Sequence, residues 1–369
     1  MKRHLSVSCV LAFVVALASI GSERSAAQTN GGVPNFDWDP LFFQDLPNRW
    51  TTGQVGGISV DNQDHTWIAH RPASITPTIR TAALTPPAAR CCTPAPPIIE
   101  FDQNGRFVRA FGGAADGYEW PTTEHGIYAD HRGDIWIAGN GKGDNHILKF
   151  TNTGKFLLQI GRRGQSKGSS DRANVYGAAA MVVFPKTNEL FVADGYTNRR
   201  VIVFDADTGA FKRTWGAFGK PPGGKDNCAI ARVAEFPPGD GLPDFNVAHS
   251  IRVSNDGTVY LADRENRRVQ MFTSDGKFVK QLRQTAEPFA TNLAFSPDRD
   301  QQFLYVGGGK AITIIDRKTF DVLGRVQVEK QLGGGHHIAT DSKGNLYIAQ
   351  TTAGMQRLLF KGLSGPAVR

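Results

Sequence analysis

Residues 251–272 read IRVSNDGTVYLADRENRRVQMF, and this stretch decides the fold. It contains an apolar run, a polar turn with Asn, Asp and Gly, a second run with an aromatic residue, and a third run, each of a length typical of short β-strands. The first two runs and their turn recur along the chain. The six copies are ISVDNQDHTWIAH (58–70), IYADHRGDIWIAG (127–139), VVFPKTNELFVAD (182–194), IRVSNDGTVYLAD (251–263), LAFSPDRDQQFLYVG (293–307) and IATDSKGNLYIAQ (338–350).

Most copies are followed by a third and a fourth run, as in VIVFDADTGAFKRTWG (201–216). Six repeats of four antiparallel strands predict an all-β protein, a six-bladed β-propeller over residues 51–363. Three insertions rich in Gly, Pro or Ser lengthen the earlier repeats, near 72–97, 163–176 and 217–247. The sixth copy lacks an outermost strand, so we expect residues 28–50 to supply it and to close the ring, with 364–369 as a tail.

The N-terminus is typical of a secretory signal peptide. Lys2 and Arg3 precede an apolar run over 5–21, and small residues at 25–27 offer a cleavage site. We therefore expect residues 1–27 to be removed and the product to be secreted or periplasmic. No later segment is long and apolar enough to predict a membrane span.

The net charge and the distribution of basic residues narrow the classes of molecule that the protein could bind. Removing residues 1–27 takes away three basic residues and one acidic residue, which lowers the formal net charge from +8 to +6. The basic residues are scattered, which argues against nucleic acid and supports only a mild attraction to anionic substrates. Cys91, Cys92 and Cys228 remain, and the sequence leaves their pairing open.

Aligning the six copies predicts a metal site. The residues two positions before the leading aliphatic residue are Gly56, His125, Ala180, His249, Thr291 and His336. Histidine alternates with small residues, and alternate blades of a closed six-fold ring are about 120° apart, so three imidazoles at one height point to one spot near the axis. Such a set is typical of catalytic zinc with an open fourth position. His337 is an ambiguous neighbour, and the shared His-x-Ile spacing favours His336.

Three polar residues lie where the second strand of a blade ends. Because the two strands are antiparallel, this end lies on the same face of the ring as the start of the first strand. Arg71 and Arg264 both lie two residues past an alanine that ends this strand, and Tyr196 follows Asp194 and Gly195. A guanidinium can bind a carboxylate through two parallel hydrogen bonds. A phenol near a cation can act as a base. These residues are the candidate catalytic groups beside the metal.

The repeat text resembles that of the NHL-repeat propellers, notably in ADGYTNRRVIVF (193–204) and ADRENRRVQMF (262–272). Within that group it is most similar to the peptidyl-α-hydroxyglycine α-amidating lyases, from about Gly53 to Phe360. The motifs that carry this resemblance are AHR (69–71), HGI (125–127), DGYTNRR (194–200), AHSI (248–251), ADREN (262–266) and HHI (336–338).

The resemblance implies a zinc ion held by His125, His249 and His336. It implies that Tyr196 removes the substrate's hydroxyl proton, that Arg264 and zinc keep this phenol acidic, and that Arg71 holds the substrate carboxylate. The implied reaction cleaves the C–N bond of a peptidyl- or N-acyl-α-hydroxyglycine, or of another carbinolamide, to an amide and glyoxylate. We expect a monomeric lyase with a small-molecule or peptide substrate.

The resemblance also implies a structural calcium held by the backbone carbonyls of Ile58 and Ile127. The acidic side chain that would complete this site falls on His337. Two other functions are compatible with the repeats. One is a non-catalytic NHL propeller that binds a protein or cell-envelope ligand. The other is a calcium-dependent lactonase-type hydrolase, whose carboxylate-rich site fits three axial imidazoles poorly.

Overall fold

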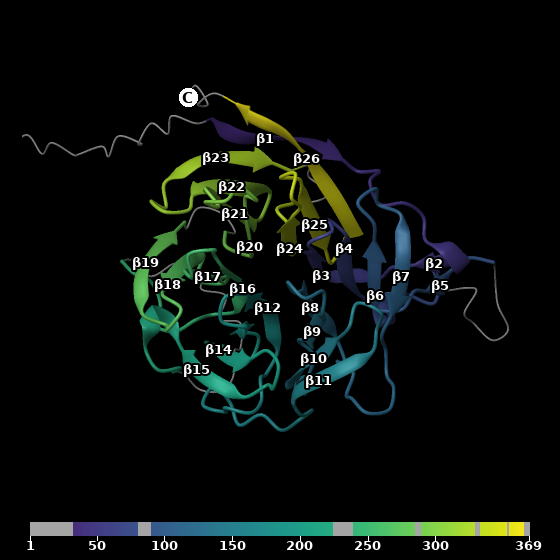
Figure 1. Cartoon of the computed structure of the whole chain (residues 1–369), viewed down its shortest axis with the longest axis horizontal. Helices are drawn as coiled ribbons and strands as arrows, with labels where there is room; N and C mark the ends of the chain where they lie inside the picture. The colour runs from purple at the N-terminus through teal and green to yellow at the C-terminus, as the bar shows by residue number, and fades with distance from the viewer. Residues whose placement is uncertain are drawn as a thin grey trace, which may run out of the picture. The chain divides into compact units, whose positions relative to one another are not determined.

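A computed structural model describes residues 32–79, 90–223, 239–284, 289–328, 333–352 and 354–364. They lie in the compact unit Gly31–Arg369. Six antiparallel sheets of four strands each follow one another around a ring within these residues (Figure 1). The prediction of an all-β, six-bladed propeller is therefore confirmed. The expected signal peptide, 1–27, lies outside the described residues.

Each blade carries its first strand nearest the axis (Figure 1). From the axis outward, blades one to three are formed by β3 (Gln54–Val60), β4 (Thr66–Arg71), β6 (Ile98–Phe101) and β7 (Phe107–Phe111); by β8 (Glu124–Ala129), β9 (Ile135–Gly139), β10 (His146–Phe150) and β11 (Phe156–Gly161); and by β12 (Ala178–Phe184), β13 (Glu189–Asp194), β14 (Arg200–Asp205) and β15 (Phe211–Trp215). Blades four to six are formed by β16 (Ala248–Val253), β17 (Val259–Asp263), β18 (Arg268–Phe272) and β19 (Phe278–Arg283); by β20 (Asn292–Phe295), β21 (Phe303–Gly308), β22 (Ala311–Asp316) and β23 (Val322–Gln327); and by β24 (His337–Thr340), β25 (Leu346–Gln350), β26 (Gly354–Ser364) and β1 (Val33–Asp39).

Strand β1 is the outermost strand of blade six, although it comes first in the chain. It pairs antiparallel with β26, from Val33 opposite Ser364 to Asp39 opposite Arg357. Arg357 Nε also donates to Asp39 Oδ2 over 3.1 Å. The two ends of the described chain therefore share one blade, which leaves no open seam in the ring.

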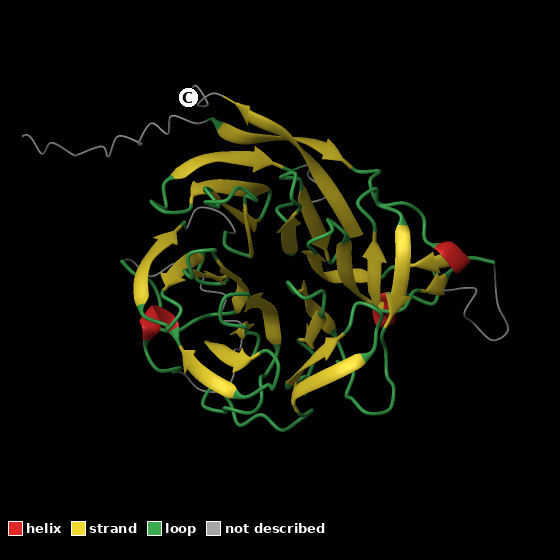
Figure 2. Cartoon of the chain, viewed as in Figure 1, coloured by secondary structure: helices red, strands yellow, loops and turns green. Residues whose placement is uncertain are grey.

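The remaining elements are short (Figure 2). They are the 3₁₀ turns η1 (Pro47–Arg49), η2 (Pro72–Ser74) and η4 (Ala217–Gly219) and the two-residue strands β2 (Trp50–Thr51) and β5 (Thr93–Pro94). Cys91 and Cys92 are joined to each other in a disulfide, while Cys228 lies outside the described residues. Among the described residues, no helix is long and apolar enough to cross a membrane.

The polar turn of the repeat holds the blade together. In blade one, Asp61 Oδ1 accepts hydrogen bonds from the backbone N–H groups of Gln63 and His65, and Asp61 Oδ2 accepts from Trp67 Nε1 over 2.8 Å. One carboxylate thus closes the turn and satisfies the indole of a buried ring. Each second strand buries an aromatic residue at the same position: Trp67, Trp136, Phe191, Tyr260, Tyr305 and Tyr347.

The Asn and Arg residues that recur at the start of the third strand in blades three and four are structural. Arg268 Nε lies 2.7 Å from Asp263 Oδ2, and Asn266 donates to the same oxygen. Arg200 and Asp194 make the equivalent pair in blade three. All four charged side chains have no exposed surface. Because a buried charge is tolerated only when it is paired, each pair ties the second strand to the third.

Candidate metal centre

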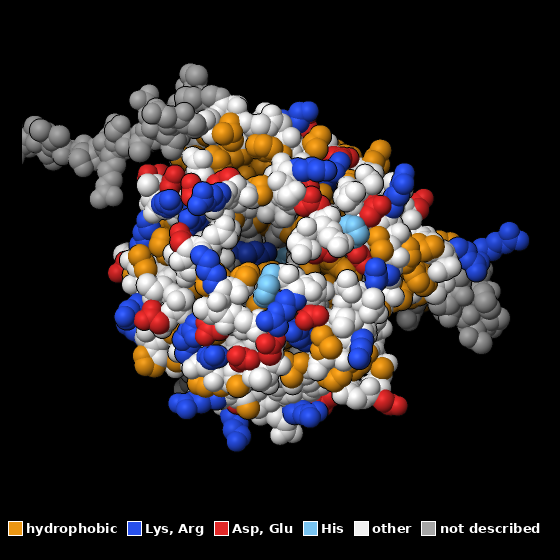
Figure 3. Space-filling model, in the orientation of Figure 1, with side chains coloured by type: hydrophobic (Ala, Val, Ile, Leu, Met, Phe, Trp, Pro, Cys, Tyr) orange, Lys and Arg blue, Asp and Glu red, His pale blue; other side chains and the backbone are white. Residues whose placement is uncertain are grey.

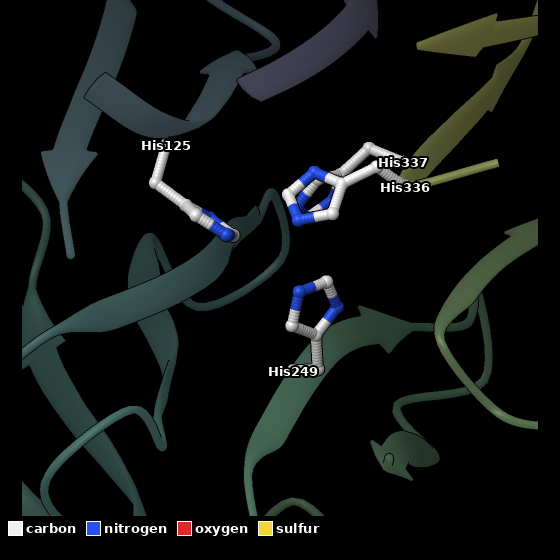
Figure 4. Close-up of side chains that lie close together, drawn as sticks. All are labelled: His125, His249, His336 and His337. Carbon is white, nitrogen blue, oxygen red and sulfur yellow. The ribbon is translucent and has the colours of Figure 1, made fainter. Parts of the chain in front are cut away.

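The inner strands that carry His125 and His249 are irregular at these two residues. In β8 the pairing register shifts between Glu124 and Ile127, and in β16 it shifts between Ala248 and Ser250. Such a β-bulge places an extra residue in one strand and redirects its side chain. His125 and His249 lie within these bulges, and their imidazoles point toward one another (Figure 4).

The register corrects the alignment of blade three. Ala180 pairs with Ala193 in the way that Ser250 pairs with Ala262. The residue equivalent to His249 is therefore Ala179, not Ala180. The bulge lies at the same place in both strands, between Ala178 and Ala180 in β12 and between Ala248 and Ser250 in β16, so the difference comes from the hairpin, which is one residue longer in blade three.

Four imidazoles gather at the predicted spot (Figure 4). They belong to His125, His249, His336 and His337, and one ligand atom of each lies within 4.8 Å of the others. The ring centroids of His125 and His336 are 4.7 Å apart, and those of His249 and His336 are 4.9 Å apart. The histidines come from blades two, four and six, so the geometry is that of a site that could hold a metal ion.

Three of these imidazoles are oriented in the same way by the next blade. Their Nδ1 atoms lie at hydrogen-bonding distance from the carbonyl oxygens of Ala179, Thr291 and Gly56: 2.8 Å for His125, 2.6 Å for His249 and 2.8 Å for His336. A carbonyl can only accept, so in each ring Nδ1 carries the proton and Nε2 keeps its lone pair. The small residues of the odd blades therefore supply the backbone acceptors that fix the metal-binding tautomer.

The environment also keeps the rings uncharged. Burial lowers the pKa of His125 and the pKa of His249 well below the ordinary value, and the neighbouring imidazoles and arginines act in the same direction. Burial likewise lowers the pKa of His336 to about 4. Neutral imidazole is the form that binds a metal, so these three rings are ready for one at pH 7.

His337 differs from the other three. Its Nε2 is buried and has no hydrogen-bond partner among the described residues. Its ring stacks on that of His249, with centroids 5.0 Å apart and an angle of 23° between the planes. His336, with its carbonyl partner, follows the pattern of His125 and His249, whereas His337 is a fourth imidazole within reach of the same spot.

Tyr196 enters the cluster from the loop after β13. Its hydroxyl oxygen lies 2.8 Å from His125 Nε2 and 3.1 Å from His249 Nε2. Gly195 makes this approach feasible, because a Cβ atom there would lie 2.1 Å from the carbonyl oxygen of Ala248. A side chain at position 195 would therefore push the loop away from the strand that carries His249.

Arg264 bonds the same hydroxyl, and burial and the arginine act on its pKa in opposite directions. Arg264 Nη1 donates to the Tyr196 oxygen over 3.1 Å, and Arg264 Nε donates to Glu265 Oε1 over 2.8 Å. Burial nevertheless raises the pKa of Tyr196 and outweighs the opposing effect of Arg264. Arg264 thus lowers the pKa of Tyr196, as the resemblance implies, although burial has the larger effect, and the contribution assigned to zinc stays a prediction.

Arg71 lies beside the cluster of imidazoles. Its contacts include Asn140, a residue that the sequence analysis missed. Arg71 Nε donates to the carbonyl oxygen of Glu124 over 2.8 Å, and Nη2 lies 3.5 Å from Asn140 Oδ1. Asn140 also acts on Tyr196, whose pKa it lowers. Asn140 stands two residues past Ala138, the repeat position of Arg71 and Arg264, so comparing that position in blade two could have found it.

A second group of metal-ligand atoms is already in use for structure. Asp61, His65 and Glu100 have ligand atoms within 4.8 Å of one another. Glu100, however, pairs with both His65 Nδ1 and Arg109 Nε over 2.6 Å, while Asp61 closes the turn. These bonds account for the cluster without a metal.

The residues on the axis do not fit a calcium ion. Ile58 and Ile127 have equivalents in Ile251 and Ile338, and the carbonyl oxygens of the last two accept from Arg252 Nη1 over 2.9 Å and Nη2 over 3.1 Å. The guanidinium of Arg252 thus bonds backbone carbonyls at the same height on the axis as those of Ile58 and Ile127. The cluster that contains His337 holds four imidazoles and no carboxylate among the described residues, whereas calcium prefers oxygen ligands.

Comparison with known families supports the class of protein that the fold indicates, a repeat propeller. Residues 245–272 match the model of the NHL repeat. Together with the six blades, this match confirms the resemblance to NHL-repeat propellers.

The relatives include amidating enzymes. The chain is 31% identical over 177 residues to peptidyl-glycine alpha-amidating monooxygenase A of Xenopus laevis, which covers 46% of this chain and 17% of the relative. It is 29% identical over 151 residues to a probable peptidyl-alpha-hydroxyglycine alpha-amidating lyase of Caenorhabditis elegans, covering 41% and 37%. It is also 27% identical over 187 residues to human NHL repeat-containing protein 3, covering 49% and 46%. The chain thus spans less than half of each of these three relatives.

A solved structure, that of streptogramin B lyase, shares the fold. It superposes with a TM-score of 0.51 and 15% identity, over 89% of this chain and 98% of the other. At this identity the likeness shows the propeller fold alone.

Proposed function

We propose that the protein is a zinc-dependent lyase that cleaves the C–N bond of a peptidyl- or N-acyl-α-hydroxyglycine, or of a related carbinolamide. The observation that carries the proposal is the Tyr196 hydroxyl, which lies within hydrogen-bonding distance of two cluster imidazoles and of Arg264. The relatives named as amidating enzymes support the same chemistry. We also propose that the N-terminal segment directs export, as its sequence indicates.

His125, His249 and His336 would hold the zinc through Nε2, and three imidazoles suit this metal. Bound there, zinc supplies a Lewis acid that polarises the oxygen of a substrate hydroxyl. His337 stands close enough to compete for the open position or to line it.

The chain's own groups account for the proton and the carboxylate. The reaction breaks the bond between the amide nitrogen and the α-carbon, and the electrons of the O–H bond form the aldehyde of glyoxylate. Tyr196 accepts the hydroxyl proton and returns a proton to the departing amide nitrogen, so it acts as base and then as acid. Arg264 holds the Tyr196 oxygen in place, and Arg71 binds the substrate carboxylate in a two-point contact.

Replacing Tyr196 by Phe tests the role of the hydroxyl. We expect kcat for glyoxylate release from an N-acyl-α-hydroxyglycine to fall by about 10²–10⁴-fold, the usual contribution of a general base or acid. The measurement is glyoxylate release by the zinc-loaded protein, with metal content determined on the same samples. Equal zinc in both proteins isolates the chemistry. A wild-type protein that binds zinc and releases no glyoxylate would contradict the lyase and favour a propeller that only binds a ligand.

Replacing Arg71 by Gln tests the carboxylate contact. We expect kcat/KM for the N-acyl-α-hydroxyglycine to fall by about 10- to 150-fold, because a charge-assisted hydrogen bond is lost. For an N-hydroxymethyl amide, which has the carbinolamide but no carboxylate, the variant and the wild type should react at equal rates. An equal loss on both substrates would mean that Arg71 acts only through its contacts with Gln54, Glu124 and Asn140.

A further inference from the structure

A cavity of about 270 Å³ lies on the axis at the end of the inner strands away from the metal centre. All six inner strands contribute to its wall. They do so with one repeat position, opposite the buried aromatic residue of the second strand: Ser59, Tyr128, Val182, Arg252, Ala294 and Ala339. Figure 3 shows a hollow at the centre of the ring with Lys or Arg atoms inside it.

Arg252 is the one charged side chain among the described residues that line this cavity. Its guanidinium donates to the carbonyl oxygens of Ile251 and Ile338 and makes no ion pair with a carboxylate in the described part of the chain. A guanidinium has about five N–H donors, so most of them remain available. Burial lowers the pKa of Arg252, which reflects the cost of enclosing a charge without a counter-charge.

Two neutral donors occupy the same repeat position as Arg252 in this wall. Ser59 Oγ accepts from the backbone N–H of Ala129 over 3.1 Å, and its own proton has no acceptor among the described residues. The Tyr128 hydroxyl makes no hydrogen bond there either, and burial raises its pKa to about 12, so it stays protonated. The lining residues include no Asp or Glu. The cavity therefore offers one cation and donors, and no acid to repel an anion.

We propose that this cavity binds a small carboxylate between Arg252, Tyr128 and Ser59. The planar guanidinium matches the two oxygens of a carboxylate, and the hydroxyls can complete its hydrogen bonds. A halide would leave most of 270 Å³ empty, whereas a short apolar chain would contact Val182, Ala294 and Ala339. This site is distinct from the Arg71 side of the metal centre and does not depend on the proposed lyase activity.

The test uses sodium propionate as the probe and sodium chloride at equal ionic strength as the reference. Propionate is titrated into the mature, zinc-loaded protein by calorimetry, and the shift of Tm with propionate concentration is measured in parallel. We expect saturable propionate binding and a rising Tm in the wild type. In Arg252→Met, propionate affinity should fall by at least about 10-fold. Arg132→Met, which changes an exposed arginine, should match the wild type.

Two further variants keep the test decisive. Arg71→Gln should retain the propionate binding that depends on Arg252, because the cavity lies away from Arg71, and it should lose only a separate binding event at the metal centre. Tyr128→Phe keeps the ring and removes one donor, so affinity should fall even if Arg252→Met does not fold. The proposal is overturned if propionate acts no more strongly than chloride, if both cavity variants keep the full affinity, or if only Arg71→Gln loses it.

Discussion

Replacing His249 by Ala is expected to reduce the zinc content from about one ion per chain to almost none, while the propeller stays folded. His249 supplies one of three Nε2 atoms whose rings are oriented by backbone carbonyls. Loss of an outer-shell partner alone costs about 10- to 100-fold in metal affinity, so loss of a ligand should cost at least the upper figure. The measurement is metal analysis after dialysis against zinc buffer, with circular dichroism as the check on folding.

His337 and His131 provide the matched controls. His131→Ala changes an exposed residue in a turn and should leave zinc binding unchanged. His337→Ala should retain zinc, because this imidazole lacks the carbonyl contact shared by the other three. If His337→Ala lost as much zinc as His249→Ala, the centre would be a four-histidine site.

Replacing Arg268 by Met should lower the free energy of unfolding by about 3–5 kcal/mol, because it leaves the Asp263 carboxylate buried without its partner. Both side chains are fully buried, and their atoms lie 2.7 Å apart. Burial already raises the pKa of Asp263, and the arginine opposes that effect. Denaturant unfolding, followed by tryptophan fluorescence, measures the loss.

An exposed ion pair in the same blade serves as the reference. Lys277 Nζ lies 3.2 Å from Asp275 Oδ2, with side chains 80% and 56% exposed. Lys277→Met should therefore change stability by no more than about 1 kcal/mol. The double variant Asp263→Leu with Arg268→Met should recover part of the loss, since it removes both charges. Equal effects of Arg268→Met and Lys277→Met would show that the buried pair does not stabilise the blade.

Much of the candidate site was predictable because equivalent positions of the six repeats can be aligned with one another. Histidine at one repeat position in alternate blades indicated convergence, and Arg71, Tyr196 and Arg264 followed from where the second strand ends. The structure brings the three histidines and these three residues together, directly or through Asn140. The histidines are His125, His249 and His336. Their roles in binding zinc and in catalysis remain predictions.

Two residues escaped the sequence reasoning for different reasons. Asn140 shares the repeat position of Arg71, but an amide gives no charge signal. Arg252 reads as an ordinary polar residue in a half-buried strand, and only the closed ring turns its position into the wall of an axial cavity. The shift from Ala180 to Ala179 has a different origin, because the hairpin of β12 and β13 is one residue longer than that of β16 and β17: Ala180 and Ala193 are 13 positions apart, and Ser250 and Ala262 are 12 apart.

The sequence by itself determined the propeller, the number of its blades and the height at which three histidines meet, because all of these follow from the period of the repeat. Only the tertiary structure decided which ring nitrogens are free, how burial shifts the pKa of Tyr196 and which carbonyls Arg252 bonds. These properties depend on atoms from residues far apart in the chain, such as His336 and Gly56, that come within 3 Å only when the ring closes.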